Sequence, residues 1–314
     1  MNVLITAIGS MSAQTVINSL RTNGNNKIVG CDIYPIKWTP ESLEVDVFYQ
    51  VPKTTDDLYL DNIFSICEEN EIEFIIPLID PEVDILSVNR DTFVERGIIL
   101  GIPNDFCIKN GRNKYDLAQI IDSSDILKTV TSLSSQEVTQ LKGQTVIAKP
   151  KKGRSSEGIY LIKDIRQIDN AIQDPDDYIF QPLIKGDIYT VDYIRDKYGN
   201  DFSLCRKELK RTLNGAGLSA EIIVNKPLSE IVSYIGKKLD VLGCVNIEFI
   251  FDGKSFYLID FNPRFSAGIA FSVLAGYDFP QENLNVFYNK EINTQASIKE
   301  GFYLKKYIEI FIEK

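Results

Sequence analysis

Tyr257-Leu258-Ile259-Asp260-Phe261-Asn262-Pro263-Arg264 is the stretch of this sequence that decides the fold. In a strand alternate residues share a face, so Asp260 and Asn262 project together, and a paired strand over 245–249 can bring Glu248 beside them. Two carboxylates and an amide form an oxygen-ligand set suited to Mg²⁺, which keeps waters and takes other ligands from phosphates. Arg264 follows directly, and its planar guanidinium can reach the same phosphates.

The competing interpretation of this segment is a solvated hairpin around the Asp252-Gly253 turn, with its charged side facing water. The apolar residues of the two strands argue for a buried setting. We expect them to occupy one face and to leave the acids on the other; they are Ile247, Phe249, Phe251, Tyr257, Ile259 and Phe261.

A second segment, Val146-Ile147-Ala148-Lys149-Pro150-Lys151-Lys152-Gly153-Arg154-Ser155-Ser156-Glu157-Gly158, is a strand that ends in Lys and runs into a basic Gly/Ser loop. Such a loop offers backbone N–H groups and cations to a polyphosphate. It lacks the Gly-x-x-x-x-Gly-Lys-Ser/Thr spacing of a P-loop, and an ordinary hairpin turn also uses Gly and Ser.

The rest of the chain divides into an alternating part and a strand-rich part. Strands are predicted over 3–8, 27–33, 73–79 and 98–101, with helices to about residue 21 and over 56–70 and 82–96. This alternation predicts an α/β domain with a doubly wound parallel sheet. A helix is predicted over 114–121. After it, strands are predicted over 145–149, 158–162, 178–182, 189–195, 202–209, 244–251 and 256–261, with a helix over 228–242.

Composition narrows the possible functions. The 314 residues include no histidine, which excludes Ser-His-Asp and Cys-His systems and His-ligated zinc. The net charge of −10 disfavours nucleic acid as a partner. The five cysteines are widely spaced, which is typical of reduced thiols, and no apolar run reaches the length of a membrane span. We therefore expect a cytoplasmic protein with no membrane partner.

The two segments together, in this order, resemble the ATP-grasp superfamily, within it the carbamoyl-phosphate-synthase-like and amino-acid-ligase members. The resemblance implies an N-terminal pre-ATP-grasp domain over 1–110, a linker helix and small α+β lid over 111–186, and a C-terminal α+β catalytic subdomain with an antiparallel sheet over 187–314. It implies a C–N-bond-forming ligase that uses Mg-ATP to make an acyl phosphate from a small carboxylate, joins it to an amine, and releases ADP and phosphate. The cofactors implied are ATP and Mg²⁺, with Mn²⁺ as a possible substitute, and a homodimer is possible.

The family's roles carry over by position. Lys114 and Lys149 resemble the two phosphate-binding lysines, and Glu248, Asp260 and Asn262 the metal ligands. Arg264 resembles the guanidinium over the transferred phosphoryl group, with a looser match for Arg206 or Arg211 on the acyl-phosphate side. The remaining nucleotide contacts implied are Ser156 and Gly158 in the loop, Gln181, Leu183 and Ile184 in the hinge, and Asp187 near the ribose.

Three positions depart from the family pattern. Pro182 stands where the hinge usually has Glu, and Asp260 where many members have Glu. In Gly186-Asp187-Ile188-Tyr189-Thr190 the ribose acid falls on Ile188, so the neighbouring Asp187 is the candidate substitute.

The resemblance also implies that the N-terminal domain helps to bind a substrate. Gly9 and Ser10 precede a helix and can hold a carboxylate or phosphate. Asp80 and Glu82 follow a parallel strand and can hold an ammonium group, or else Asp80 caps the next helix. Ser266 and Gly268 can form an anion-binding turn or cap the helix near 269.

Three alternative functions remain open from the sequence. One is a carboxyphosphate enzyme that resembles carbamoyl-phosphate synthases, and another is a nucleotide-binding regulatory protein that has lost turnover. The third is an NAD-dependent reductase, since Ala7-Ile8-Gly9-Ser10-Met11-Ser12 and Asp32 resemble a degenerate dinucleotide fingerprint. It keeps only one of that fingerprint's three glycines.

Overall fold

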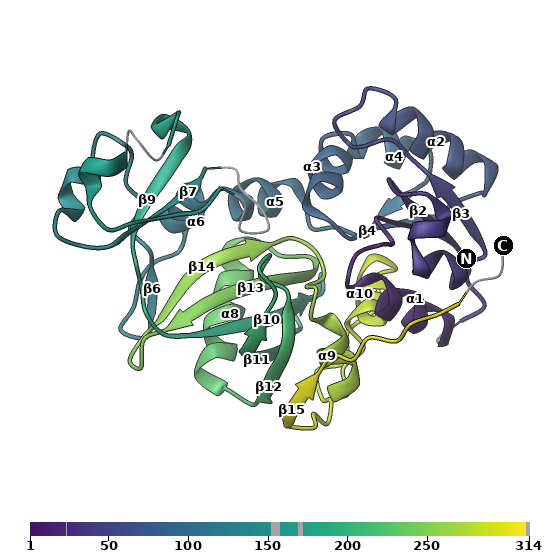
Figure 1. Cartoon of the computed structure of the whole chain (residues 1–314). Helices are drawn as coiled ribbons and strands as arrows, with labels where there is room; N and C mark the ends of the chain where they lie inside the picture. Colours follow the sequence, from purple (N-terminus) through teal and green to yellow (C-terminus); the bar gives the residue numbers. More distant parts are fainter. Residues whose placement is uncertain (23, 152–157, 169–171, 312–314) are drawn as a thin grey trace.

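The computed structural model describes residues 1–22, 24–151, 158–168 and 172–311 (Figure 1). Its N-terminal part is a five-stranded sheet in the order β3-β2-β1-β4-β5, in which every pairing is parallel. The strands are β1 (Asn2–Thr6), β2 (Lys27–Asp32), β3 (Val47–Gln50), β4 (Phe74–Pro77) and β5 (Ile99–Leu100). The helices of this part are α1 (Ala13–Thr22), α2 (Tyr59–Glu69), α3 (Asp80–Val88), α4 (Arg90–Glu95) and α5 (Asp105–Arg112). The predicted doubly wound α/β sheet is confirmed.

The two faces of this sheet enter two different cores. Val3 and Ile5 of β1 belong to a core that includes α1, whereas Leu4 of the same strand belongs to a core with α2 and α3. Both faces are covered by helices, which is why the strands are apolar throughout.

A small three-stranded antiparallel sheet, β8-β7-β9, follows in the chain. Its strands are β7 (Val146–Pro150), β8 (Tyr160–Ile162) and β9 (Tyr178–Pro182). It has its own core, which includes Val146, Ala148 and Phe180. Helix α6 (Lys114–Ile120) precedes it, and Figure 1 shows the unit standing apart from the N-terminal sheet.

The third sheet has seven strands in the order β15-β12-β11-β10-β13-β14-β6. All its pairings are antiparallel except β14 with β6, which is parallel. Its strands are β6 (Leu127–Thr129), β10 (Asp187–Arg195), β11 (Asp201–Arg211), β12 (Gly217–Ile223), β13 (Gly243–Phe251), β14 (Phe256–Asn262) and β15 (Gly301–Leu304). Helix α8 (Lys226–Lys238) packs on one face, and α9 (Ile269–Ala275) and α10 (Phe279–Phe287) pack on the other.

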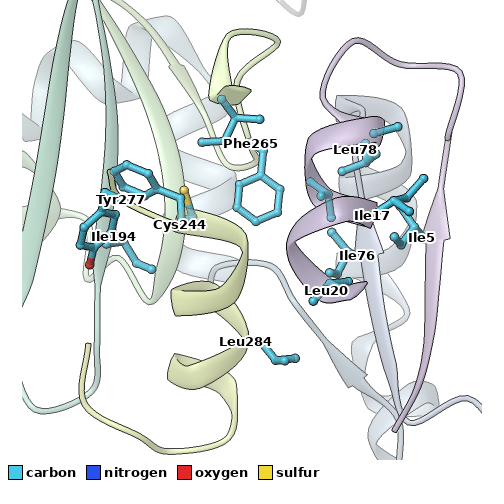
Figure 2. Close-up of a cluster of buried hydrophobic side chains, with 14 of the residues drawn as sticks. Ile5, Ile17, Leu20, Ile76, Leu78, Ile194, Cys244, Phe265, Tyr277 and Leu284 are labelled. Atoms are coloured by element: carbon cyan, nitrogen blue, oxygen red, sulfur yellow. The ribbon is translucent and has the colours of Figure 1, made fainter. Parts of the chain in front are cut away.

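The N-terminal and C-terminal parts share one core. Ile17 and Leu78 of the N-terminal part belong to the same buried cluster as Phe265 and Leu284, and Figure 2 shows these side chains between α1 and the C-terminal helices. Because apolar burial fixes how the two parts sit against each other, residues of α3 and of the loop after β14 meet in a defined place. Among the described residues, no helix is long and apolar enough to cross a membrane.

Two local predictions are wrong. The helix predicted over 82–96 is two helices, α3 and α4, which are separated at Asn89. The Asn89 side chain donates to the Ile85 carbonyl, and asparagine competes for backbone hydrogen bonds in this way. Asp80 is the first residue of α3 and not its N-cap, which is Ile79 without a side-chain cap bond.

The predicted apolar face of β14 is also wrong in part. A register shift lies between the pairs Glu248↔Asp260 and Phe249↔Leu258, so Ile259 is an extra residue in the β14 strand. Beyond this bulge the alternation is reversed: Leu258 enters the core with Ile247, whereas Ile259 lines the cavity described below.

Candidate active site

A cavity of about 440 Å³ lies between the three-stranded sheet and one face of the seven-stranded sheet. Lys149 of β7 lines it from the first sheet, and Thr190 of β10 and Glu248 of β13 line it from the second. Lys114 at the start of α6 and Arg264 after β14 also line it. The cavity therefore brings together the two segments that the sequence singled out.

The acid cluster has the predicted arrangement. Glu248 pairs directly with Asp260 across β13 and β14, and Asn246 pairs with Asn262 on the same face. The Asn262 side-chain amide donates to Asn246 Oδ1 at 3.3 Å. Asn246 was not predicted, although its position two residues before Glu248 on the same strand would have placed it there.

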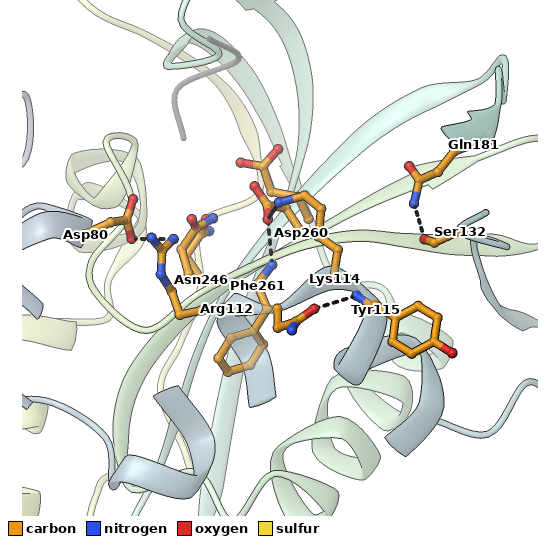
Figure 3. A network of polar contacts seen from close by, with 12 residues as sticks. Asp80, Arg112, Lys114, Tyr115, Ser132, Gln181, Asn246, Asp260 and Phe261 are labelled. Atoms are coloured by element: carbon orange, nitrogen blue, oxygen red, sulfur yellow. Dashed lines mark hydrogen bonds and ion pairs between the residues drawn. The ribbon is translucent and has the colours of Figure 1, made fainter. Parts of the chain in front are cut away.

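Each of the two acids is paired with a cation. Lys114 Nζ lies 2.9 Å from Asp260 Oδ1, and Arg211 Nη2 lies 2.8 Å from Glu248 Oε2 (Figure 3 shows the first pair). Burial raises the pKa of Glu248, Arg211 lowers it and the nearby Asp260 raises it again. This pair of carboxylates therefore favours added positive charge.

Lys149 is a second lysine that lines the first cavity near these acids. Burial lowers the pKa of Lys149, as does Lys114, whereas Asp260 and Glu248 oppose this effect. The lysine from β7 and the lysine from α6 therefore lie within electrostatic reach of each other and of both acids, as an anion with several negative charges would require.

The cavity lining also has an apolar component. It includes five isoleucines, four from strands of the two sheets and one directly before β8: Ile147, Ile188, Ile250, Ile259 and Ile159. In the sequence these residues look like ordinary core positions of strands, so nothing in the pattern marked them as site residues. Ile188 is the position where the family pattern has an acid.

A second cavity, of about 270 Å³, lies between the N-terminal sheet and the loop after β14. Ser10, Met11 and Leu78 line it from the N-terminal part, and Arg264 and Ala267 line both this cavity and the first. The two cavities therefore share a wall formed by this loop.

An ionic cluster stands at that wall. Arg264 Nη2 donates to Asp80 Oδ2 at 2.8 Å, and Arg112 Nη1 lies 3.3 Å from Asp80 Oδ1, a pair that Figure 3 shows. Burial opposes ionisation of Asp80, but Arg264 and Arg112 together lower the pKa of its carboxyl. Asp80 is thus an ionised anchor for two guanidinium groups.

Arg206 is fully buried below the same loop, and it also lines the first cavity. Its guanidinium pairs with Asp192 and donates to Ser272 Oγ at 2.7 Å and to Ser266 Oγ at 3.0 Å. A Cβ at Gly268 would lie 3.1 Å from Arg206 Nη2, so the loop runs directly over this side chain. Arg206 therefore fixes the loop at Ser266 and Gly268.

Three predicted residues are not brought into the cavities. Asp187 is exposed and forms a 2.7 Å pair with Lys207, on the face of β10 opposite Ile188. Glu82 is buried, where it accepts hydrogen bonds from Thr6 Oγ1 at 2.5 Å and Tyr59 Oη at 3.1 Å. The amide of Gly9 donates to Asp32 Oδ2 at 2.8 Å, and of the predicted pair only Ser10 lines the second cavity.

The predicted hinge residues lie near the first cavity but do not line it. The side chain of Gln181 donates to Ser132 Oγ at 2.9 Å (Figure 3), and the amide of Leu183 donates to the Thr145 carbonyl at 2.9 Å. Leu183 and Ile184 line a neighbouring cavity. Gly158 has φ +69° at the base of the basic loop, and Ser156 lies outside the described residues.

Several buried polar atoms at the first cavity have no hydrogen-bond partner among the described residues. They are Thr190 Oγ1, Arg206 Nε, Glu208 Oε2 and Arg264 Nε. Such atoms are costly to bury unless a ligand or water meets them. No group of three acidic or cysteine side chains within the described residues could hold a metal, so the candidate metal set is two acids and an amide.

Two protein-family models match this chain. Residues 112–268 match the model of the ATP-grasp domain, and residues 3–100 match the model of the PylC-like N-terminal domain. The carbamoyl phosphate synthase large chain of Clostridium acetobutylicum is 25% identical over 301 residues, which cover 88% of this chain and 27% of that protein. The chain thus spans about a quarter of the length of this curated relative.

Solved structures share the fold. The biotin carboxylase domain of Hydrogenobacter thermophilus 2-oxoglutarate carboxylase, a dimer in complex with MgADP, ADP and bicarbonate, matches with a TM-score of 0.78 and 18% identity over 96% of this chain and 73% of that one. The N5-carboxyaminoimidazole synthetase of Staphylococcus aureus, complexed with ADP, matches with a TM-score of 0.73 and 14% identity. The match covers 95% of this chain and 79% of that one. At these identities the likeness concerns the fold alone.

Proposed function

Because the chain belongs to the ATP-grasp family, we propose that it is an ATP-dependent ligase that activates a small carboxylate as an acyl phosphate and joins it to an amine. The observation that carries this proposal is the first cavity, whose lining combines five isoleucines with two lysines and two acids. Isoleucine side chains suit an adenine ring, and the charged groups suit a triphosphate with its metal ion.

Lys114 and Lys149 are the proposed phosphate-binding lysines. They come from different elements, α6 and β7, and the charge of each is partly compensated by the acids below them. For the adenine we propose contact with Ile147 and Ile188 and with the hinge at Leu183 and Ile184. Asp187 is not part of the proposed ribose contact, because it lies on the other face of β10.

Glu248, Asp260 and Asn262 are the proposed ligands of Mg²⁺, for which Mn²⁺ can substitute. The donor set fits a hard cation, since it consists of oxygen atoms on one face and the burial of Glu248 favours a positive neighbour. When bound, Mg²⁺ would neutralise charge on the phosphate oxygens. The two lysines and Arg211 contribute cationic charge from the protein itself.

Arg264 links the two proposed substrates. It lines both cavities, and Asp80 and Asn262 hold its guanidinium at 2.8 and 3.4 Å. We propose that the second cavity admits the small carboxylate and that Arg264 stabilises the charge that develops as the phosphoryl group is transferred. Phosphoryl transfer asks the protein mainly for alignment and cationic charge, so no histidine is needed.

Two other functions have support of their own. The likeness to a carbamoyl phosphate synthase large chain favours bicarbonate as the activated carboxylate. The cavity has Ile188 where the family pattern has an acid, and Asp187 points away from it. The lack of this acid favours a regulatory protein that binds the nucleotide without turnover. A homodimer is also proposed, as one related fold is described as a dimer.

The test is ADP release with Mg-ATP and a panel of carboxylates, including bicarbonate, each with and without amino acids as amines. The ligase proposal predicts ADP release that requires both a carboxylate and an amine. Release with bicarbonate alone would favour the carboxyphosphate reaction, and binding of Mg-ATP without any turnover would favour the regulatory protein. Binding of NADH without binding of Mg-ATP would point to a reductase.

A further inference from the structure

Glu208 of β11 is a buried acid that the site described so far does not use. Its side chain is 3% exposed, it lines the first cavity, and its Oε2 atom has no hydrogen-bond partner among the described residues. A Cβ atom added at Gly217 would lie 2.6 Å from Oε2, so this carboxylate oxygen occupies the space that a side chain on the neighbouring strand would take. A buried carboxylate that lines a cavity and keeps one oxygen without a hydrogen-bond partner calls for a ligand that carries positive charge or a proton.

The neighbours of Glu208 orient it without occupying that oxygen. Arg206 Nε lies 3.7 Å from the other oxygen, Oε1, which is an ion pair but too long for a hydrogen bond. The guanidinium charge of Arg206 is already matched by Asp192. Lys305 Nζ donates to the Ala267 carbonyl at 2.7 Å, so this cation holds the loop above.

The position of Glu208 lies between the proposed metal site and the loop at the second cavity. Arg206, two residues before it, touches the loop at Ser266, and Arg211, three residues after it, pairs with Glu248. Glu208 also raises the pKa of Glu248, which places its charge near that acid, yet it forms no three-acid metal group there. Its site thus adjoins the place where an acyl phosphate would form, and it is distinct from the metal ligands.

We propose that Glu208 receives the acceptor amine and takes its proton. This inference rests on the proposed ligase function. The ammonium group R–NH₃⁺ gives a proton to the Glu208 carboxylate and becomes R–NH₂. The nitrogen lone pair then forms the C–N bond, the bond between the acyl carbon and the phosphate oxygen breaks, and phosphate leaves with that electron pair. The second nitrogen proton goes to the departing phosphate, so the products are the amide and hydrogen phosphate, and Glu208 later returns its proton to solvent.

The charged groups that interact with Glu208 are Arg206 on β11, Lys305 after β15 and Glu248 on β13, and Arg211 lines the same cavity. The competing role for Glu208 is structural, as a negative charge that balances Lys305. A structural role predicts that substitution of Glu208 lowers the rate of ADP release equally with every acceptor. A role as proton acceptor predicts that the rate falls only with acceptors that arrive as ammonium ions. Hydroxylamine is already neutral at pH 7, so its rate should not depend on Glu208.

The experiment compares the wild-type chain with Glu208→Gln and with Glu221→Gln, a control acid on β12. ADP release at pH 7 is measured with each carboxylate of the panel, first with hydroxylamine and then with L-amino acids as acceptors. We expect Glu208→Gln to lower the rate with amino acids by about a hundredfold or more, and to leave the hydroxylamine rate within about threefold of wild type. The remaining amino-acid rate should rise about tenfold per pH unit below the pKa of the amine.

The other outcomes are equally decisive. Equal rates of wild type and Glu208→Gln with amino acids, or equal losses with both acceptors, would overturn the assignment while the ligase function stands. A wild-type chain that releases no ADP with any carboxylate and acceptor would overturn the ligase function, and the role of Glu208 with it. Glu221→Gln should behave as wild type throughout.

Discussion

Lys114 Nζ lies 2.9 Å from Asp260 Oδ1, a contact between residues that are 146 positions apart in the chain. One is a proposed phosphate ligand and the other a proposed metal ligand. Binding of Mg-ATP would exchange this pair for two others, Lys114 with phosphate and Asp260 with Mg²⁺. Since each ion keeps an opposite charge beside it, the exchange avoids an unpaired buried charge.

Substitution of Lys114 tests this exchange. Lys114→Met keeps the length of the side chain and removes its charge, so we expect ATP affinity to fall by about tenfold or more, which corresponds to about 1.4 kcal/mol. Calorimetric titration of ATP measures this, with the exposed Lys109→Met as the control. Unchanged affinity in Lys114→Met would show that Lys114 does not contact the nucleotide.

Arg206 should be important for stability. Arg206→Met leaves Asp192, which is also fully buried, without its cationic partner. We expect the free energy of unfolding to fall by about 3–5 kcal/mol, and the double variant Arg206→Met with Asp192→Leu to recover part of that loss. Urea denaturation followed by circular dichroism measures both. A loss below about 1 kcal/mol in the single variant would contradict the buried pair.

Glu82 should make stability depend on pH. Burial raises the pKa of Glu82 from 4.5 to about 8, although Thr6 and Tyr59 donate hydrogen bonds to it. The folded chain therefore keeps a proton that the unfolded chain releases. This stabilisation is complete below about pH 4.5 and is lost as the pH rises to about 8. Over this range the free energy of unfolding falls by at most about 1.4 kcal/mol per pH unit.

Glu82→Gln should remove this dependence, because its amide stays neutral across the range. Urea denaturation at pH 5, 6, 7 and 8 should therefore give a smaller decline in unfolding free energy than in the wild type. The exposed Glu68→Gln serves as the control. Parallel curves for wild type and Glu82→Gln would mean that Glu82 ionises normally.

Much of the fold and part of the site followed from sequence periodicity. The alternation of strands and helices predicted the parallel sheet. The two-residue period of a strand placed Asp260 and Asn262 on one face, with Glu248 beside them on the paired strand. These features depend on local pattern and on one hairpin. Lys114 was predicted from the resemblance to the family, and Lys149 from its place at the end of a strand before the basic loop; the structure places both at the first cavity.

Other features depend on three-dimensional register, which periodicity does not contain. The bulge at Ile259 reverses the alternation of β14, and only the pairing with β13 reveals it. Asp187 and Ile188 are neighbours, and which of them faces the cavity depends on how β10 sits in the sheet. Glu208 looks like a surface acid in a polar strand, whereas in the fold its carboxylate lies against Gly217 of β12 and 3.7 Å from Arg206 Nε.

The most direct test of the metal and nucleotide assignment is the affinity for ATP with Mg²⁺ and with EDTA, in the wild type, Glu248→Gln and Asp260→Asn. We predict that Mg²⁺ strengthens ATP binding to the wild type by at least about tenfold, a difference of about 1.4 kcal/mol. Both variants should fold normally, lose this difference and release no ADP. A wild type that binds ATP equally well without Mg²⁺, or variants that keep the full metal dependence, would contradict the proposed site.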